Sequence, residues 1–322
     1  MISGDIVDGK IYGWGVADDL MGVAAGVCAL DLLASKGTVL AGDVMMCSTP
    51  SKRNANGVTA VMQGMELAGT ADASLYLHPA ESGAGLQEIK ALASGQLKFK
   101  ITVQGMPPDT TEPGHAAFSH LAVNAIDKAL VIRDALVTLG EERATRVHHP
   151  LLEETVGRST NVLIGAIESS GQFNSARVPA TCSIGGAISY PPPETLLGVQ
   201  AEFEEAIAKC IAADEWLSEH RPEVVWLAGT TATEVPLDSP LYTTVAAAVE
   251  FVTGVTPFCN AMHTSSDIRV PPVQIGAPCV GIGSLCGNLA QNGLADEWVD
   301  VEDFVKLVHV TAQIIEDWCG TV

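Results

Sequence analysis

The stretch QLKFKITV (96–103) decides the fold of the middle of this 322-residue chain, because polar and apolar residues alternate along it. Such alternation is typical of a strand with one face in water. The elements predicted after it are a helix at 122–139, strands at 160–169 and 180–190, a helix at 194–213 and a strand at 222–229. The order β-α-β-β-α-β is that of a ferredoxin-like sandwich.

The sequence on both sides of this run alternates between strands and helices. Upstream we predict a helix at 22–35 that stops at Gly37, a strand at 42–49, a helix at 57–69 and a strand at 73–79. Downstream we predict a helix at 241–254, a buried strand at 278–283 and a helix at 301–319. This alternation indicates a parallel α/β sheet. We therefore predict one α/β domain made of residues 1–94 and 229–322, with the ferredoxin-like domain inserted at 95–228.

The composition indicates a large core beneath an acidic surface. The chain is 47% hydrophobic and its net charge is −21. An acidic surface repels phosphate backbones, so nucleic-acid binding is not expected. No uninterrupted apolar run reaches membrane-spanning length, and the N-terminus does not resemble a signal peptide, so we expect no membrane association. The eight cysteines form no C-x-x-C pair, which favours a reduced, cytoplasmic protein.

The segment GKIYGWGVADDLMGVAAGVCAL (9–30) resembles a signature of the acetylornithine deacetylase, succinyl-diaminopimelate desuccinylase and carboxypeptidase G family. The resemblance implies a zinc-aminopeptidase-like α/β domain with an inserted lid, and metal-dependent amidohydrolase chemistry. It places Asp18 on the carboxylate that bridges two metal ions. An aspartate suits that position, because its two oxygens can hold two cations about 3.5–4 Å apart. From the local sequence alone, Asp18 is equally well explained as a cap for the following helix.

Two segments of the predicted lid also resemble family motifs. GHAAFSHLAVNAI (114–126) resembles the motif whose histidine, here His115, crosses a dimer interface to stabilise the intermediate in the partner's site. GQFNSARVPATC (171–182) resembles the segment whose asparagine, here Asn174, contacts substrate. The resemblance therefore implies a homodimer or heterodimer formed through the lid, with QLKFKITV as a candidate edge strand for the pairing.

Two later segments extend the resemblance over essentially the whole chain. TSSDIRVPP (264–272) resembles an S-D-x-R loop, which implies that Asp267 and Arg269 bind substrate. LADEWVDVEDFV (294–305) matches the family's closing D-E-W-V-x-x-E-D segment.

Three family positions are altered in this chain. The first metal ligand lies in an H-x-D motif, and the 17 residues before Asp18 contain none. Where the family has P-D-E-E, with one Glu to activate water and one to bind metal, this chain has Pro-Ser-Lys52-Arg53, and neither cation can replace a metal-bound carboxylate. The last ligand histidine falls on Gly293 or Asn292, and neither is a credible ligand.

Asp18 and His78, which stands in LYLHP (75–79), remain as metal candidates for zinc, cobalt or manganese. A catalytic zinc needs three protein ligands. His263 and Glu81 are further candidates for a rebuilt site.

Lys52 and Arg53 follow the predicted strand at 42–49, at the carboxyl end where open α/β sheets bind ligands. In that place they either hold the carboxylate of an anionic ligand or point to solvent.

Two hypotheses follow. The first is a degenerate, non-hydrolytic member of the family that binds a small anionic ligand or a partner subunit. The alternative is an active amidohydrolase of N-acyl amino acids or small peptides with a rearranged site, favoured by the retained Asp18, His78 and His115. A variant of this alternative obtains the missing segment from another chain or from sequence upstream of Met1.

Overall fold

The computed structural model of the chain describes residues 4–48, 71–80, 82–110, 116–169, 176–261, 267–286 and 296–322. The chain divides into two compact units, Met1–Ala93 with Thr233–Val322 and Ser94–Ala232. The sequence-predicted boundaries fall after residues 94 and 228. The second lies too early, because strand β9 (Glu223–Thr230) continues to Thr230, which pairs with Gln96.

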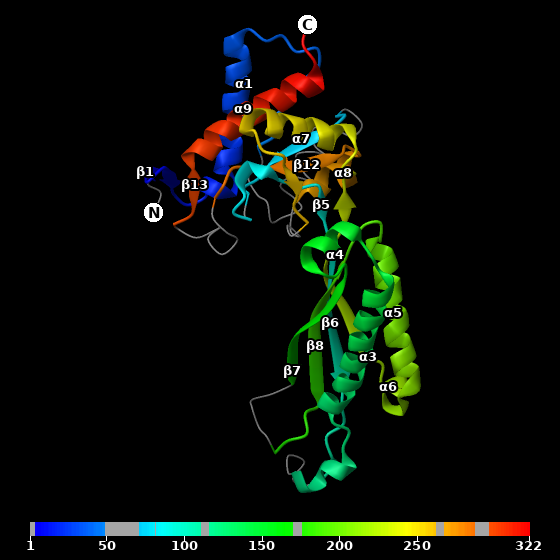
Figure 1. Cartoon of the computed structure of the whole chain (residues 1–322). Coiled ribbons are helices and arrows are strands. Elements are labelled where there is room, and N and C mark those ends of the chain that lie inside the picture. Colours follow the sequence, from blue (N-terminus) through cyan, green and yellow to red (C-terminus); the bar gives the residue numbers. More distant parts are fainter. Residues whose placement is uncertain are drawn as a thin grey trace. The chain divides into compact units, whose positions relative to one another are not determined.

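The second unit contains a four-stranded antiparallel sheet (Figure 1). Its strands, in spatial order, are β7 (Asn161–Ser169), β8 (Thr181–Tyr190), β6 (Gly95–Gln104) and β9. The predicted alternation along β6 is confirmed, since Leu97, Phe99 and Ile101 are buried and the lysines between them are exposed. However, β6 lies between β8 and β9. Its main chain is already paired on both sides, so the expectation that 96–103 forms a sheet edge is wrong.

Two long helices cover the sheet, α3 (Ala125–Arg146) and α5 (Leu196–Ala213) (Figure 1). The side chain of Asn124 caps the first helix and that of Thr195 caps the second. The rings of Phe99 and Phe203, whose centroids are 4.6 Å apart, join α5 to the sheet. The shorter helices of this unit are η3 (Ala116–Leu121), α4 (Pro150–Val156) and α6 (Glu215–Glu219). The predicted β-α-β-β-α-β order is confirmed by β6, α3, β7, β8, α5 and β9.

The first unit packs helices around a short parallel pair of strands. Strands β3 (Ser74–Leu77) and β12 (Cys279–Ile282) pair in parallel, and β12 is buried throughout. Helix α9 (Val301–Cys319) contacts both α1 (Met21–Lys36) and α7 (Pro240–Thr253). As predicted, α1 stops at Gly37, whose φ of 71° favours glycine.

Smaller strands and helices complete this unit. An antiparallel sheet contains β1 (Asp5–Val7), β2 (Lys10–Tyr12) and β13 (Trp298–Asp300). Strand β4 (Glu88–Ile89) pairs with β11 (Phe258–Cys259), and β5 (Leu92–Ala93) pairs with β10 (Thr233–Glu234). The short helices are η1 (Val16–Leu20), η2 (Gly85–Gln87), η4 (Asp267–Arg269) and α8 (Val270–Ile275).

The prediction of a strand at 42–49 is wrong as far as residue 48. No described residue pairs with this stretch, and a strand requires a hydrogen-bonded neighbour. Thr49 and the predicted helix at 57–69 lie outside the described residues. Among the described helices, none has the length and apolar character needed to cross a bilayer.

Candidate metal centre

Asp18 and Asp19 lie in η1, the short turn that leads from β2 into α1. The chain enters this turn through Gly15, whose φ of 77° is rarely adopted by other residues. Asp18 has a non-helical backbone (φ −113°, ψ 84°), and its peptide bond to Asp19 is cis. The turn carries two adjacent carboxylates shortly before Met21, the first residue of α1.

His78 directly follows β3, and only 2% of its surface is exposed. Its Nε2 lies 3.6 Å from Oδ1 of Asp18 and 3.8 Å from Oδ1 of Asp19. Its Nδ1 lies 3.2 Å from the carbonyl oxygen of Pro79. Because a carbonyl can only accept a hydrogen bond, Nδ1 donates to it, and Nε2 is the ring nitrogen that faces the two carboxylates. Metal-binding histidines commonly make this kind of hydrogen bond with their second nitrogen.

Glu297 holds the loop that carries the two aspartates. Its fully buried carboxylate accepts hydrogen bonds from the main-chain N–H groups of Gly15 at 2.8 Å, Ala17 at 3.1 Å and Asp18 at 3.2 Å. The glutamate directly precedes β13, which pairs with β2. Sequence reasoning matched the D-E-W-V segment without giving Glu297 a role, although a glutamate fixed within a motif was the available signal.

The donor set fits one divalent cation. One imidazole nitrogen and two carboxylate oxygens, from His78, Asp18 and Asp19, all lie within 4.8 Å of one another. Nitrogen and carboxylate oxygen are donors that zinc, cobalt and manganese accept, and three protein ligands are typical of a catalytic zinc site. Asp19 was not predicted as a ligand. A second cation would need donors beyond these three.

The other predicted site residues are not gathered at this cluster by the described structure. Asp267 and Arg269 lie in η4, where the intervening Ile268 packs with Ala93 and Cys279. The remaining predicted or candidate positions lie outside the described residues: Lys52, Arg53, Glu81, His115, Asn174, His263, Asn292 and Gly293.

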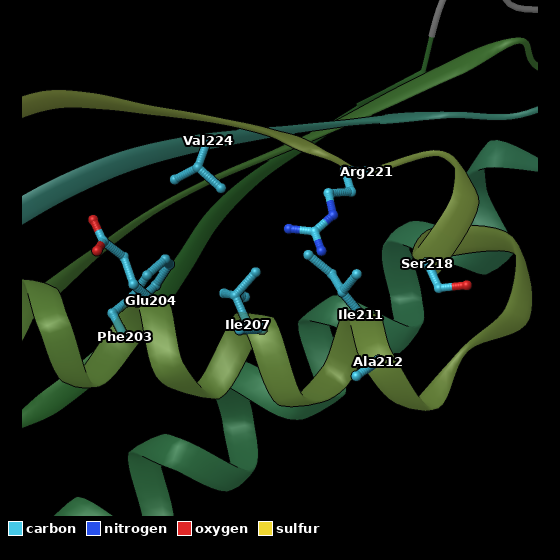
Figure 2. A pocket seen from close by; sticks show the side chains of 9 residues that line it. Phe203, Glu204, Ile207, Ile211, Ala212, Ser218, Arg221 and Val224 are labelled. Carbon is cyan, nitrogen blue, oxygen red and sulfur yellow. The ribbon is translucent and has the colours of Figure 1, made fainter.

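The second unit contains a separate hollow of about 400 Å³ between α5 and the start of β9 (Figure 2). Its floor is apolar and includes Phe203, Ile207 and Val224. The guanidinium of Arg221 projects toward α5 across this hollow (Figure 2). None of the residues that the sequence analysis selected lines it.

Comparison with known proteins identifies the family. The model of peptidase family M20/M25/M40 matches residues 2–317. The chain belongs to this family. It is 26% identical over 318 residues to a succinyl-diaminopimelate desuccinylase from Rhodospirillum centenum, across 98% of this chain and 75% of that protein.

Solved structures share the fold of this M20 chain. Aminopeptidase PepT from Bacillus cereus has a TM-score of 0.72 at 20% identity, over 97% of this chain and 75% of that one. The YXEP protein from Bacillus subtilis, a dinuclear metal-binding peptidase of the M20 family, has a TM-score of 0.63 at 14% identity, over 94% and 72%. The suspected family and the predicted α/β fold class are confirmed. Membership in this family of metallopeptidases and amidohydrolases supports a divalent metal in general.

Proposed function

We propose that this M20 chain binds one divalent cation through Asp18, Asp19 and His78, and with it a small anionic ligand of the N-acyl amino acid type. The observation that supports this is that three candidate ligand atoms, one from each residue, lie within 4.8 Å of one another. Zinc, cobalt or manganese would supply a Lewis acid that attracts a ligand carboxylate or amide oxygen. In this proposal Lys52 and Arg53 add positive charge for the anionic ligand.

We further propose that the chain does not hydrolyse its ligand by the family's route. The family's water-activating glutamate is replaced at the Lys52-Arg53 positions, and a general base typically contributes 10²–10⁴-fold to such a rate. The Glu297 carboxylate is bound by three main-chain N–H groups and is not available as a base. His115 could stabilise a tetrahedral intermediate only if water were first activated.

The alternative is an active amidohydrolase with a rearranged site, acting on N-acyl amino acids or small peptides. A specific observation favours it. Asp19 raises the number of candidate ligands from two to three, which is the number that catalytic zinc sites use.

One set of experiments separates the two functions. Zinc, cobalt and manganese binding is measured by calorimetry for the wild type, for Asp18→Asn, and for Asp31→Asn, which changes an exposed carboxylate on α1. We expect about one equivalent in the wild type and Asp31→Asn, and a large loss of affinity in Asp18→Asn. N-acetylornithine and other N-acyl amino acids are then tested for binding and turnover with each metal. Metal-dependent turnover abolished by Asp18→Asn would establish the alternative, and absence of metal binding in the wild type would refute both.

We also propose that the lid unit forms the subunit contact of a homodimer or heterodimer. The edges of its sheet are β7 and β9, and β7 exposes 62% of Leu163 and 49% of Ile167. Unpaired strand edges can hydrogen-bond to a second chain. Sedimentation at micromolar concentration tests this, since a strictly monomeric mass, alone and with candidate partners, contradicts it. A reduced, cytoplasmic setting belongs to the same proposal, since all eight cysteines are free thiols.

A further inference from the structure

Lys90 and Glu88 form a fully buried ion pair in the first unit. Nζ of Lys90 lies 3.0 Å from Oε1 of Glu88, and neither side chain is exposed. The other oxygen of Glu88 accepts the main-chain N–H of Ser82 at 3.2 Å. Burial raises the pKa of the Glu88 carboxyl, but Lys90 and hydrogen bonds from Ser82 and Asn260 outweigh burial and hold that pKa below its ordinary value. The carboxyl is therefore ionised at neutral pH.

The ammonium group of Lys90 also reaches the chain segment that carries His78. It donates to the carbonyl oxygen of Pro79 at 2.8 Å and to that of His78 at 3.3 Å. The ammonium therefore makes two hydrogen bonds to main-chain carbonyls and an ion pair with the Glu88 carboxylate.

The carbonyl of Pro79 connects Lys90 to the ring of His78. This oxygen accepts from Nζ of Lys90 at 2.8 Å and from Nδ1 of His78 at 3.2 Å. A carbonyl oxygen has two lone pairs, so these two donors match its capacity. The bond to Nδ1 orients the imidazole so that Nε2 points at Asp18 and Asp19.

Lys90 is itself fixed to the parallel strand pair. Its main-chain N–H donates to the carbonyl of Gly281 in β12 at 2.7 Å, and the N–H of Gly281 returns a bond of 2.7 Å to the carbonyl of Lys90. A side chain on Gly281 would begin 3.2 Å from Cβ of Lys90, so the backbone of β12 runs close to the lysine stem.

We infer that Lys90 is a positioning residue for the cation centre, and that it acts through the Pro79 carbonyl on the orientation of the His78 ring. Glu88 balances its charge. The inference rests on the proposed function only where it concerns cation affinity, because the orientation of His78 can be measured without metal. Outer-shell partners of this kind typically change metal affinity by about 10–100-fold.

The first test uses the metal-free wild type. ¹⁵N NMR of the histidine rings, with the His78 signals identified by their loss in His78→Gln, reports which ring nitrogen carries the proton. We expect Nδ1 of His78 to carry a proton. A His78 ring whose Nδ1 is unprotonated in the wild type would overturn the inference, whatever any variant does.

The second test removes the ammonium. Because Lys90→Met alone leaves a buried carboxylate unpaired, the variant is the double change Glu88→Gln with Lys90→Met, which removes both charges. Arg143→Met is the matched control, since it removes a buried cation of the second unit. All variants are checked for folding by circular dichroism.

We expect the double variant to shift or broaden the His78 ring signals and to weaken Co²⁺ binding by about 10–100-fold. Arg143→Met should keep the wild-type His78 signals. Unchanged His78 signals in a folded double variant would overturn the inference. If the wild type binds no Co²⁺, the proposed function fails, while the NMR measurements still decide the role of Lys90.

Discussion

Replacing Glu297 by Gln should loosen the loop that carries Asp18 and Asp19. In the wild type, two carboxylate oxygens accept three main-chain N–H groups at 2.8–3.2 Å. The glutamine amide keeps one oxygen and replaces the other with an NH₂ group that cannot accept. At least one N–H therefore loses its acceptor, and the bonds that remain lose their charge. A hydrogen bond to a charged group contributes about 1.5–3 kcal/mol, so we expect the loop conformation held by Glu297 to lose about 2 kcal/mol of stability relative to an open loop.

Hydrogen exchange at the amides of Gly15, Ala17 and Asp18 measures this loss locally. A loss of about 2 kcal/mol corresponds to roughly 30-fold faster exchange. Glu302→Gln is the control, because its carboxylate is 82% exposed on α9 and, within the described part of the chain, pairs with Lys306. If Glu297→Gln left the protection of these three amides unchanged, or if the control accelerated them equally, Glu297 would not be what holds the loop.

Three further predictions concern the rest of the fold. Gly186→Ala should lower the stability of the second unit by about 2 kcal/mol in urea unfolding, because the new Cβ would lie 2.4 Å from the carbonyl oxygen of Leu163 and 2.5 Å from Cζ of Phe99. In Gly165→Ala the new Cβ would have no neighbour within 4 Å, so its unfolding free energy should stay near that of the wild type. Burial raises the pKa of the Asp214 carboxyl, but hydrogen bonds from Lys128 and Leu217 outweigh burial and hold that pKa below its ordinary value of 3.8. The ionised carboxylate therefore stabilises the fold above pH 3.8, and this stabilisation is lost as the pH falls through the lowered pKa. The difference in unfolding free energy between the wild type and Asp214→Asn should shrink on acidification. A difference that stays constant with pH would contradict this role of Asp214. Iodoacetamide at mildly alkaline pH should label the exposed Cys28 and Cys47 first, and early labelling of Cys279, whose pKa burial raises to about 12, would show that β12 is not buried as described.

Periodicity in the sequence was enough to predict the elements of the second unit, but it did not predict their neighbours. The alternation of Leu97, Phe99 and Ile101 shows that one face of β6 is exposed to solvent. A central strand can have one solvent-exposed face just as an edge strand can, so the alternation does not distinguish the two positions. The end of β9 at Thr230 is set by pairing with Gln96, which lies more than a hundred residues away. The strands β1, β2 and β13 have three residues each, too few to show a period.

The candidate site was predictable where one residue sits in one motif, as for Asp18 and His78. It was not predictable where the geometry depends on the turn. Neighbouring residues usually point in different directions, and Asp19 joins Asp18 only because the non-helical backbone of η1 aims both carboxylates at His78. Glu297 was missed because its partners are main-chain N–H groups, although its place in the D-E-W-V segment was an available signal. Lys90 was missed because its link to His78 runs through main-chain carbonyls, which no side-chain pattern records.

Because β5 pairs with β10, the inserted unit could be deleted without changing the strand order of the first unit. The chain leaves the first unit after Ala93 and returns at Thr233, and these two residues are cross-strand partners. A two-residue Asn-Gly turn could therefore join them as an ordinary hairpin, with no rethreading of the host domain. The insert's own ends are also neighbours, since Gln96 lies opposite Thr230. Host domains tolerate insertions whose two ends lie close together, so the first unit can keep its own strand pairing whatever the insert contains.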